Sequence, residues 1–278
     1  MKSTNSKAVF HDIKSKLKLD EPEEAHAIAL ALMEKYYDFT LTDILSEKEI
    51  EIKNLDEIIA RLNQHEPLQY VLGDAEFFGR KFIVNPSVLI PRPETELLVH
   101  EVLKMKLKSP RILDVGTGSG CLAITLSLEI SNSKVYAIDV SQNSLDTAKI
   151  NSKKLGADVS FLLNDFLKNI PSIDPVEVIV SNPPYIRNSE KTSMSSNVLN
   201  YEPHLALFVS DRDPLIFYQA IASKSKTLLK PFGKIFVEIN ESFGNEVKEL
   251  FKSHGLEEVK IIKDLDGKDR IVTASKSR

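Results

Sequence analysis

The chain has 278 residues, of which 42% are hydrophobic and 27% are charged, a composition typical of a soluble globular protein with about two domains. Its 36 basic and 40 acidic side chains give a formal net charge of −4, which argues against a protein that coats nucleic acid through a strongly basic surface. With only 10 glycines and 13 prolines, the chain is neither fibrous nor predominantly disordered.

The cysteine content and the first residues indicate the cellular compartment. Cys121 is the only cysteine, so no intrachain disulfide can form, as is usual for proteins of a reducing compartment. Residues 1–20 lack the apolar segment of a secretory signal, and no run approaches the ~18 apolar residues that a membrane-spanning helix needs. We therefore expect a cytoplasmic protein that does not contact membranes.

Residues 1–70 are predicted to form a small helical bundle. One apolar face follows helical spacing and consists of Ala25, Ile28, Leu32, Met33 and Tyr36. Asp20 with Glu23, and Asn54 with Glu57, have the spacing of capping boxes, in which two side chains satisfy free N–H groups at the start of a helix. The 9 basic and 14 acidic residues of this region give a net charge of −5, which favours a solvated helical surface over a contact surface for a basic partner.

A change of pattern follows this bundle. Pro67 is expected to end the helical region, because proline lacks the N–H group that a continuing helix needs. Beyond it, Gly73 and Gly79 separate short runs rich in residues that favour strands. Residues 71–90 are therefore predicted to form a β-hairpin linker between two domains.

Residues 91–278 alternate between strand and helix patterns. Helices are expected to begin at Pro93, which suits the first helical position, and near Cys121, and to span residues 141–155, 214–229 and 246–254. Strands are expected at residues 111–114, 134–139, 159–163, 176–180, 234–239, 257–262 and 270–274. This alternation predicts an α/β domain with a mainly parallel, doubly wound sheet and helices on both faces.

A glycine-rich loop joins the first of these strands to the helix near Cys121. It reads Asp-Val-Gly-Thr-Gly-Ser-Gly over residues 114–120, and such glycines let the chain turn sharply and let a ligand approach the backbone. The dinucleotide-binding fingerprint requires its third glycine at position 121, where Cys121 stands, and no phosphate-binding P-loop occurs. A loop at the carboxyl edge of an open α/β sheet is nevertheless a ligand-binding position.

Two aspartates suit a nucleoside ligand with a cationic tail. Asp139 ends the second strand, where a carboxylate can accept hydrogen bonds from both ribose hydroxyls. Asp114 precedes the glycine loop and can orient an ammonium group. This pairing points to S-adenosyl-L-methionine (SAM); the alternative is a structural turn that binds no ligand. Asp165 and Phe166 follow the third strand at the same edge, where they could hold an adenine ring or, for Phe166, belong to the core.

The tetrapeptide Asn182-Pro183-Pro184-Tyr185 follows the fourth strand directly. Its two prolines fix the backbone and remove two N–H donors, leaving a stiff turn that offers only acceptors. The Asn182 side-chain oxygen and the Pro183 carbonyl can accept both N–H bonds of one planar NH2 group, on which Tyr185 can stack. The turn therefore predicts methylation of an amide or an exocyclic amine.

Three further segments narrow this assignment. They are Ile90–Glu96 (IPRPETE), Tyr201–Pro203 (YEP) and Asp264–Arg270 (DLDGKDR). With the glycine loop and the Asn-Pro-Pro-Tyr turn, they resemble the release factor glutamine methyltransferases, the PrmC/HemK family, from about Pro67 to near the end of the chain. The resemblance implies a seven-stranded, Rossmann-like, SAM-dependent methyltransferase domain, preceded by a helical bundle that recognises the release factor and a β-hairpin linker.

The same resemblance implies the reaction and the site. A methyl group passes from SAM to the side-chain amide nitrogen (N5) of the glutamine in the Gly-Gly-Gln loop of peptide chain release factors, leaving S-adenosyl-L-homocysteine. The residues implied in cofactor binding are Gly116, Thr117, Gly118, Ser119, Gly120, Asp139, Phe166 and Asn182. Those implied in holding the glutamine are Asn182, Pro183, Pro184 and Tyr185. We expect a monomer without a bound metal ion and without direct contact to nucleic acid.

Three alternatives remain at this stage. A related enzyme class methylates a glutamine of a ribosomal protein, but its members tend to read Pro-Arg-Ser-Pro where this chain has Pro-Arg-Pro-Glu at residues 91–94. A DNA adenine-N6 methyltransferase uses the same tetrapeptide on a flipped base, yet it needs a basic target-recognition region, and residues 1–70 are acidic. A catalytically inactive SAM-binding scaffold is disfavoured by the intact tetrapeptide.

Two departures from the family pattern affect local loops. Residues 210–215 (SDRDPL) replace a stretch that usually carries glycines, and Asn240 stands where glycine is frequent. Both raise a question about loop geometry and leave the predicted reaction unchanged.

Overall fold

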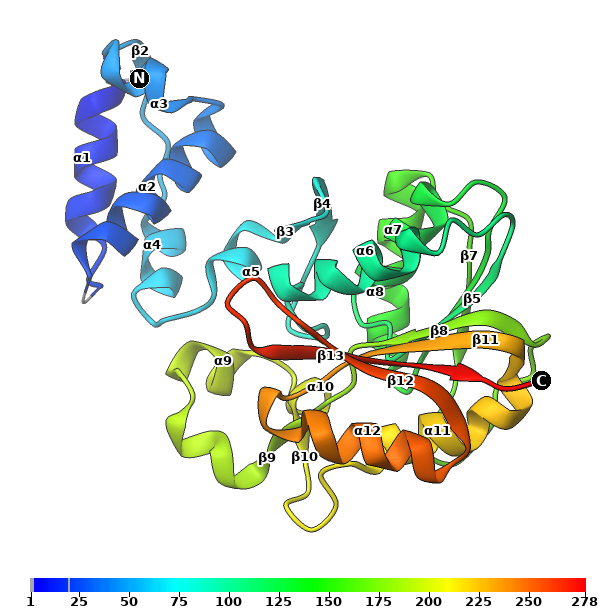
Figure 1. Cartoon of the computed structure of the whole chain (residues 1–278). Helices are drawn as coiled ribbons and strands as arrows, with labels where there is room; N and C mark the ends of the chain where they lie inside the picture. The colour runs from blue at the N-terminus through cyan, green and yellow to red at the C-terminus, as the bar shows by residue number, and fades with distance from the viewer. Residues whose placement is uncertain (1–2, 20) are drawn as a thin grey trace. The chain divides into compact units, whose positions relative to one another are not determined.

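The computed structural model describes residues 3–19 and 21–278 and divides the chain into two compact units (Figure 1). The first unit contains the chain up to Gly73 together with Ser196–Tyr201, and the second contains Asp74–Ser195 and Glu202–Arg278. The boundary thus lies three residues beyond position 70, and the expected linker hairpin belongs to the second unit.

The first unit is helical. Its helices are α1 (Ser6–Lys16), α2 (Pro22–Tyr37), α3 (Leu41–Leu45), α4 (Asp56–Leu62), α5 (Leu68–Leu72) and α9 (Ser196–Tyr201). Strands β1 (Ser3–Asn5) and β2 (Glu49–Glu51) form a short antiparallel pair. The apolar stripe of α2 is buried at Ile28, Leu32 and Met33, where it packs in one hydrophobic cluster with α1 and α4. The helical bundle is confirmed.

The helix starts within this bundle differ from the expected ones. Asn54 and Glu57 do not form a capping box: α4 begins at Asp56, and the Asn54 side-chain oxygen accepts from the Asp56 N–H at 2.9 Å. That bond closes a turn before the helix and stands in place of the bond from the Glu57 N–H that a capping box requires. The other expected box begins at Asp20, which lies outside the described residues.

A capping box does occur at the start of α3. The Thr40 N–H donates to the Asp43 carboxylate at 2.8 Å, and the Asp43 N–H donates to the Thr40 hydroxyl at 3.4 Å. The pair has the Thr-x-x-Asp spacing of the motif, and it encloses only a five-residue helix, which lacks the long apolar periodicity that draws attention in a sequence.

Pro67 does not end the helical region, contrary to the sequence prediction. It is the N-cap of α5, a position where its missing N–H costs nothing. After Gly73, β3 (Asp74–Phe77) and β4 (Arg80–Ile83) form the expected hairpin, turning through Phe78 and Gly79 at φ values of 51° and 68°. Two such residues make the tight turn whose twist matches paired strands.

The second unit is built on a seven-stranded sheet. Its strands are β5 (Arg111–Val115), β6 (Lys134–Asp139), β7 (Val159–Leu163), β8 (Val176–Ser181), β11 (Leu229–Glu238), β12 (Leu256–Lys263) and β13 (Asp269–Lys276). They lie in the order β12-β13-β11-β8-β5-β6-β7, and β13 alone runs antiparallel to its neighbours. The doubly wound α/β fold is confirmed.

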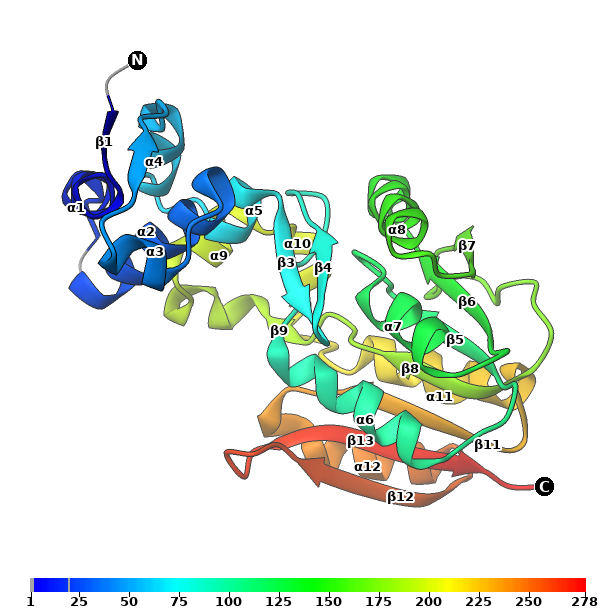
Figure 2. The ribbon, with the colours of Figure 1, turned by 90° about the horizontal axis from the view of Figure 1, so that it is seen from above.

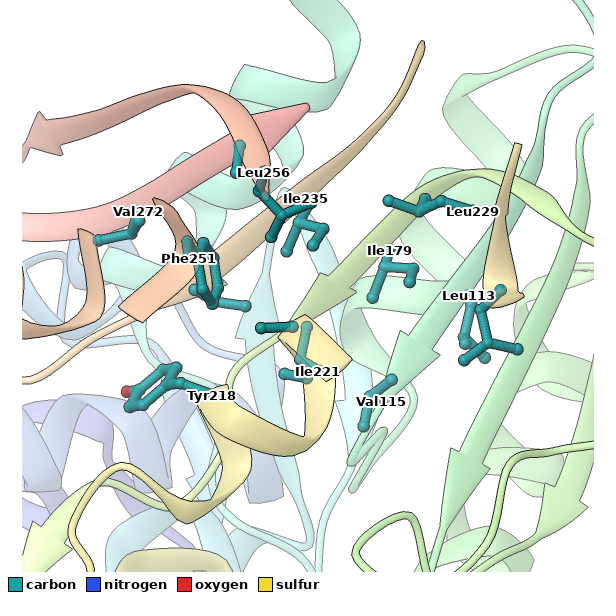
Figure 3. Packing of buried hydrophobic residues seen from close by; sticks show 14 of the residues in the cluster. Leu113, Val115, Ile179, Tyr218, Ile221, Leu229, Ile235, Phe251, Leu256 and Val272 are labelled. Carbon is teal, nitrogen blue, oxygen red and sulfur yellow. The ribbon is translucent and has the colours of Figure 1, made fainter. Parts of the chain in front are cut away.

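Helices cover both faces of this sheet (Figure 2). The 3₁₀ turn η1 (Pro93–Thr95) and helices α6 (Glu96–Lys104), α7 (Cys121–Glu129) and α8 (Gln142–Leu155) lie on one face, and α11 (Ile216–Leu228) and α12 (Gly244–Ser253) on the other. Each face has its own hydrophobic core. Beneath α11 and α12, side chains of β5, β8, β11 and β13 meet Tyr218 and Ile221 of α11 and Phe251 of α12 (Figure 3). The β3–β4 hairpin packs in the core on the opposite face, beside α6 and α7, where Phe77 and Phe82 are fully buried.

The strand order explains where a site can form. The chain passes from β5 outward through β6 to β7 and then returns to β8 on the other side of β5. Helices leave opposite faces of the sheet at this reversal, so the loops that follow β5 and β8 diverge and leave a crevice at the carboxyl edge. The glycine loop follows β5, and the Asn-Pro-Pro-Tyr turn follows β8.

The segment between Tyr185 and Pro214 contains elements that the sequence patterns did not predict. They are β9 (Ile186–Arg187), the 3₁₀ helix η2 (Asn188–Ser193), α9, α10 (His204–Leu207) and β10 (Phe208–Val209). Each is too short to show a hydrophobic period. Asn240 caps the turn η3 (Glu241–Phe243) at φ −64°, an ordinary backbone conformation that does not require glycine. Across the described residues, no helix is both long and apolar enough to cross a membrane.

Candidate active site

A cavity of about 450 Å³ lies at the carboxyl edge of the sheet in the second unit. Four segments wall it: the glycine loop, the end of β6, the loop after β7 and the turn after β8. The remaining wall comes from residues 86–89, from the start of α8, from Pro203, Leu205 and Ala206, and from Phe217. The crevice predicted by the strand order is therefore a formed cavity with both sequence motifs on its wall.

The glycine loop has two kinds of glycine. Gly116 and Gly118 have φ values of 76° and 54° and line the cavity, and a Cβ built on either would meet no heavy atom of the described chain within 4 Å. Gly120 faces the protein instead, because a Cβ there would lie 2.8 Å from the Ile124 side chain and 3.1 Å from that of Ala148. The first two keep space open for a ligand, and the third lets α7 pack closely against α8.

Asp139 is bound to the backbone at the end of β6. Its carboxylate accepts from the N–H groups of Gly118 and Ser141, at 3.0 and 2.9 Å. Burial raises the pKa of this carboxyl above its usual value, and the two backbone bonds oppose that rise. Because a carboxylate has about four acceptor positions, Asp139 keeps capacity for hydroxyl groups in the cavity.

Asp114 is a fully buried carboxyl beneath the glycine loop. The Thr117 hydroxyl donates to one oxygen at 2.7 Å, while the other oxygen has no hydrogen-bond partner among the described residues. Burial raises the pKa of Asp114 to about 7. An ionised carboxylate in such surroundings is costly unless a positive charge approaches it, so the site favours a cationic ligand group.

Phe166 both lines the cavity and belongs to the core. Its side chain is 5% exposed and packs in the cluster beneath α11, and the Lys224 ammonium lies 4.7 Å from the ring centre. Next to it, the side-chain oxygen of Asn164 is buried with no partner in the described part of the chain. The two sequence readings of Phe166, core residue and cavity wall, thus hold together.

The turn after β8 is held to its neighbour strand. The Ser181 hydroxyl donates to the Val115 carbonyl at 2.7 Å, which ties the ends of β8 and β5 together. Asn182, Pro183 and Pro184 line the cavity, and the Asn182 side-chain NH2 donates to the Thr95 hydroxyl at 3.0 Å. The carboxamide is therefore anchored through its nitrogen.

Tyr185 takes a different position from its predicted partners. Its hydroxyl donates to the Glu238 carboxylate at 3.2 Å, its ring packs against the core cluster, and burial raises the pKa of the phenol above its usual value. Tyr185 is not among the residues that line the cavity. Its stacking on an acceptor stays a prediction, and its observed contact is a structural anchor for the turn.

The structure thus brings together most of the residues singled out from the sequence. Those on the cavity wall are Gly116, Gly118, Asp139, Asp165, Phe166, Asn182, Pro183 and Pro184. Those that do not line it are Asp114, which is fully buried beneath the loop, and Thr117, Ser119, Gly120 and Tyr185. Of these, the Thr117 hydroxyl donates to the Asp114 carboxylate, and the Ser119 carbonyl accepts from the Asn151 side chain at 2.9 Å. Both contacts support the shape of the loop.

Two residues of the site were missed in the sequence. Thr95 is 3% exposed and donates to Glu238 at 2.7 Å, and Glu238 is 1% exposed at the end of β11. A signal was present for Glu238, because it is a lone carboxylate within the apolar run from Ile235 to Ile239, and buried charges require partners. Thr95 carries no such signal.

Two of the three family-like segments, Ile90–Glu96 and Tyr201–Pro203, are joined to each other beside the cavity. The Arg92 guanidinium donates to Glu202, and the Ile90 N–H donates to the second oxygen of the same carboxylate at 3.2 Å. The Glu202 side chain is buried, so this pair fixes the loop before η1 to the loop that carries Pro203. Arg92 does not line the cavity itself, and it supports the position of Pro203 on the cavity wall through Glu202.

Within residues 3–19 and 21–278, no group of three or more His, Cys, Asp or Glu side chains could hold a metal ion. Cys121 begins α7 and packs against the core beneath α6 and α7, where burial raises the pKa of its thiol to about 12. A thiol of that pKa is a poor nucleophile.

Known families match both units of the chain. Residues 8–73 match the PrmC N-terminal domain, and residues 93–202 match the methyltransferase small domain. The chain is 43% identical over 265 residues to the release factor glutamine methyltransferase of Bacteroides thetaiotaomicron, covering 92% of this chain and 94% of that protein. The chain belongs to the release factor glutamine methyltransferase family.

A second family member agrees with this assignment, and a solved structure supports the fold. The release factor glutamine methyltransferase of Enterococcus faecalis is 40% identical over 258 residues, covering 91% of this chain and 92% of that protein. A methyltransferase of Pyrococcus furiosus superposes with a TM-score of 0.53 at 20% identity, covering 73% of this chain and 91% of that one. At that identity the superposition supports the methyltransferase fold alone.

Proposed function

We propose that this protein transfers the methyl group of SAM to the side-chain amide nitrogen of the glutamine in the Gly-Gly-Gln loop of peptide chain release factors. One observation carries the proposal: the carboxamide of Asn182 is anchored at the wall of the same cavity that the glycine loop lines. The names of the family members identify glutamine in release factors as the acceptor class.

The residues around the cavity fit SAM. The unpartnered oxygen of buried Asp114 suits the ammonium group of the methionine part, and Asp139 suits the ribose hydroxyls. The open space over Gly116 and Gly118 admits a ligand against the backbone. Phe166 offers an apolar wall for adenine. When bound, SAM supplies an electrophilic methyl carbon on its sulfonium.

The turn after β8 has the chemistry to hold the acceptor. The Asn182 side-chain oxygen and the Pro183 carbonyl each accept one N–H bond of a planar carboxamide. A reacting amide nitrogen becomes pyramidal and loses conjugation, which makes its N–H bonds more acidic and strengthens both hydrogen bonds. The two oxygens thus stabilise the transition state more than the bound glutamine.

The remaining proton needs no strong base in this scheme. When bound, SAM would give up its methyl carbon and leave as the neutral thioether S-adenosyl-L-homocysteine, and the methylated amide nitrogen would carry one proton too many. That proton is then strongly acidic and passes to water. Asn182 and Pro183 hold the nitrogen in place until the proton has left. This scheme is consistent with the lining residues of the turn after β8, Ser181 to Pro184, none of which is an ionisable base.

The proposal includes the accompanying properties. The protein acts as a monomer in the cytoplasm, without a metal ion, without contact to a membrane and without binding nucleic acid itself. The first unit recognises the release factor outside the Gly-Gly-Gln loop, which is supported by the match of residues 8–73 to the PrmC N-terminal domain.

A labelling experiment tests the function. The purified protein is incubated with methyl-labelled SAM and, in separate reactions, with release factor, with release factor carrying Ala in place of the Gly-Gly-Gln glutamine, with ribosomal subunits and with DNA. We expect label only in the first reaction, with the added methyl located on that glutamine by mass spectrometry. Transfer to a ribosomal protein or to DNA, with none to the release factor, would refute the proposal.

A further inference from the structure

A chain of buried hydrogen bonds runs from the cavity wall into the core of the second unit. The Asn182 NH2 donates to the Thr95 hydroxyl at 3.0 Å, and that hydroxyl donates to one oxygen of Glu238 at 2.7 Å. Tyr185 donates to the other oxygen at 3.2 Å, and Tyr218 donates to the Glu238 backbone carbonyl at 3.0 Å. Glu238 and Thr95 are 1% and 3% exposed, so water does not compete for these bonds.

The chemistry of this chain dictates its direction. A carboxylate can only accept hydrogen bonds, whereas a threonine hydroxyl has a single proton to donate. Because that proton is directed to Glu238, the Thr95 oxygen can only accept from its other neighbour. Asn182 must then present its NH2 to Thr95, which turns its oxygen away from Thr95.

The orientation of Asn182 matters for the proposed reaction. The oxygen and the nitrogen of a carboxamide are nearly equal in size, so shape alone does not choose between the two orientations. Only an oxygen toward the acceptor can bind the N–H of a glutamine amide. A nitrogen in that position would place two donors against each other.

We propose that Thr95 and Glu238 are positioning residues that hold the Asn182 oxygen toward the acceptor amide. The inference rests on the proposed function and adds the residues that set its geometry. Thr95 ends η1 and is the N-cap of α6, and Glu238 ends β11, so the acceptor side is aligned by elements that lie outside the turn itself.

The Thr95→Val variant tests the proposal, because valine keeps the shape and removes the hydroxyl. We expect kcat to fall by about tenfold, the size of one neutral hydrogen bond, while the Kd for SAM stays at the wild-type value. Thr95→Ser, which restores the hydroxyl, should recover most of kcat. Thr125→Val is the matched control, since Thr125 is a buried threonine whose hydroxyl lacks a partner among the described residues, and it should retain wild-type kcat.

A second measurement uses the ionisation of Glu238. Burial raises the pKa of Glu238 to about 6, and below that pH the carboxyl has a proton of its own to donate to Thr95, which reverses the chain. We expect kcat to fall as the pH decreases through about 6, and Glu238→Gln, which cannot titrate, to lack this acidic limb. The titratable groups that surround Glu238 are Glu94 of η1, Cys121 of α7, Tyr185 of the turn, Tyr218 of α11 and Arg270 of β13.

A third readout does not depend on the acceptor. The NMR signal of the Asn182 side-chain NH2, identified by its loss in Asn182→Ala, should exchange slowly with water in the wild type and in Thr95→Ser, and faster in Thr95→Val. A wild-type protein that does not methylate the release factor would refute the proposed function, and the exchange rates would still judge the positioning role. The positioning role would be overturned if Thr95→Val and wild type had equal exchange rates and equal kcat, or if the acidic limb of kcat persisted in Glu238→Gln.

Discussion

The glycine loop after β5 and the Asn-Pro-Pro-Tyr turn after β8 lie on neighbouring strands and wall one cavity, yet they are built differently. The glycine loop owes its shape to its own backbone, through positive φ values at three glycines. In the turn, the orientation of the Asn182 carboxamide is set by Thr95, which lies 87 residues away in the chain, and through Thr95 by Glu238.

This difference separates two ways of making a binding surface. Residues close in sequence suffice where the ligand needs space and backbone contact, because local conformation creates both. Residues from distant elements are needed where a side chain must point in one of two equally shaped directions, because only its hydrogen-bond partners distinguish them. Substitutions in the loop should therefore change cofactor affinity, and substitutions in the turn should change the chemical step.

The largest expected effect is that of Asn182→Ala. Removing one of the two oxygens that bind the acceptor should lower kcat by roughly 10²–10³-fold, as for other preorganised groups at a reacting centre. The Kd for SAM, measured by calorimetry, should change little. Asn169→Ala, at an exposed position that does not line the cavity, is the control and should keep wild-type kcat. A comparable loss of SAM affinity in Asn182→Ala would erase the distinction between the two regions.

Gly118→Ala should produce the opposite pattern. At φ 54° an alanine is strained by ~1–2 kcal/mol, and its Cβ would occupy open space on the cavity wall. We expect the Kd for SAM to rise by about tenfold, equivalent to ~1.4 kcal/mol, with kcat at saturating SAM nearly unchanged. Gly156→Ala has a similar backbone strain at φ 72° at the end of α8. Gly156→Ala should lower the melting temperature about as much as Gly118→Ala does, but it should leave the Kd for SAM at the wild-type value. Equal SAM affinity in the two variants would contradict the role of Gly118.

A further expected effect concerns stability and not the reaction. The pKa of Asp114 is raised by burial to about 7, so between pH 4 and pH 7 the folded protein retains a proton that the unfolded chain has released. The free energy of unfolding should therefore decrease as the pH rises through this range. In Asp114→Asn this decrease should be smaller, as measured by urea unfolding without SAM at pH 5 and pH 8. An identical decrease in variant and wild type would show that the buried Asp114 carboxyl does not cause this loss of stability.

Much of the fold followed from short-range patterns. The strands at 134–139 and 159–163 occur at the predicted residues, and the helix from Gln142 is capped by Ser141. These elements are long and regular enough for their hydrophobic period to identify them. The elements between Ile186 and Val209 were not predicted, because these two-residue strands and short helices are stabilised by the contacts they make and not by their own sequence.

The sequence by itself determined the order of strands and helices, the glycine loop, the acceptor turn and the family, because each depends on residues that are neighbours in the chain. Tertiary structure alone decided that Thr95 and Glu238 orient Asn182, that Tyr185 points into the core, and that the hairpin packs with the second unit. Those features join residues that are far apart in sequence, and a buried polar group shows its partner only when the packed elements bring the two within hydrogen-bond distance.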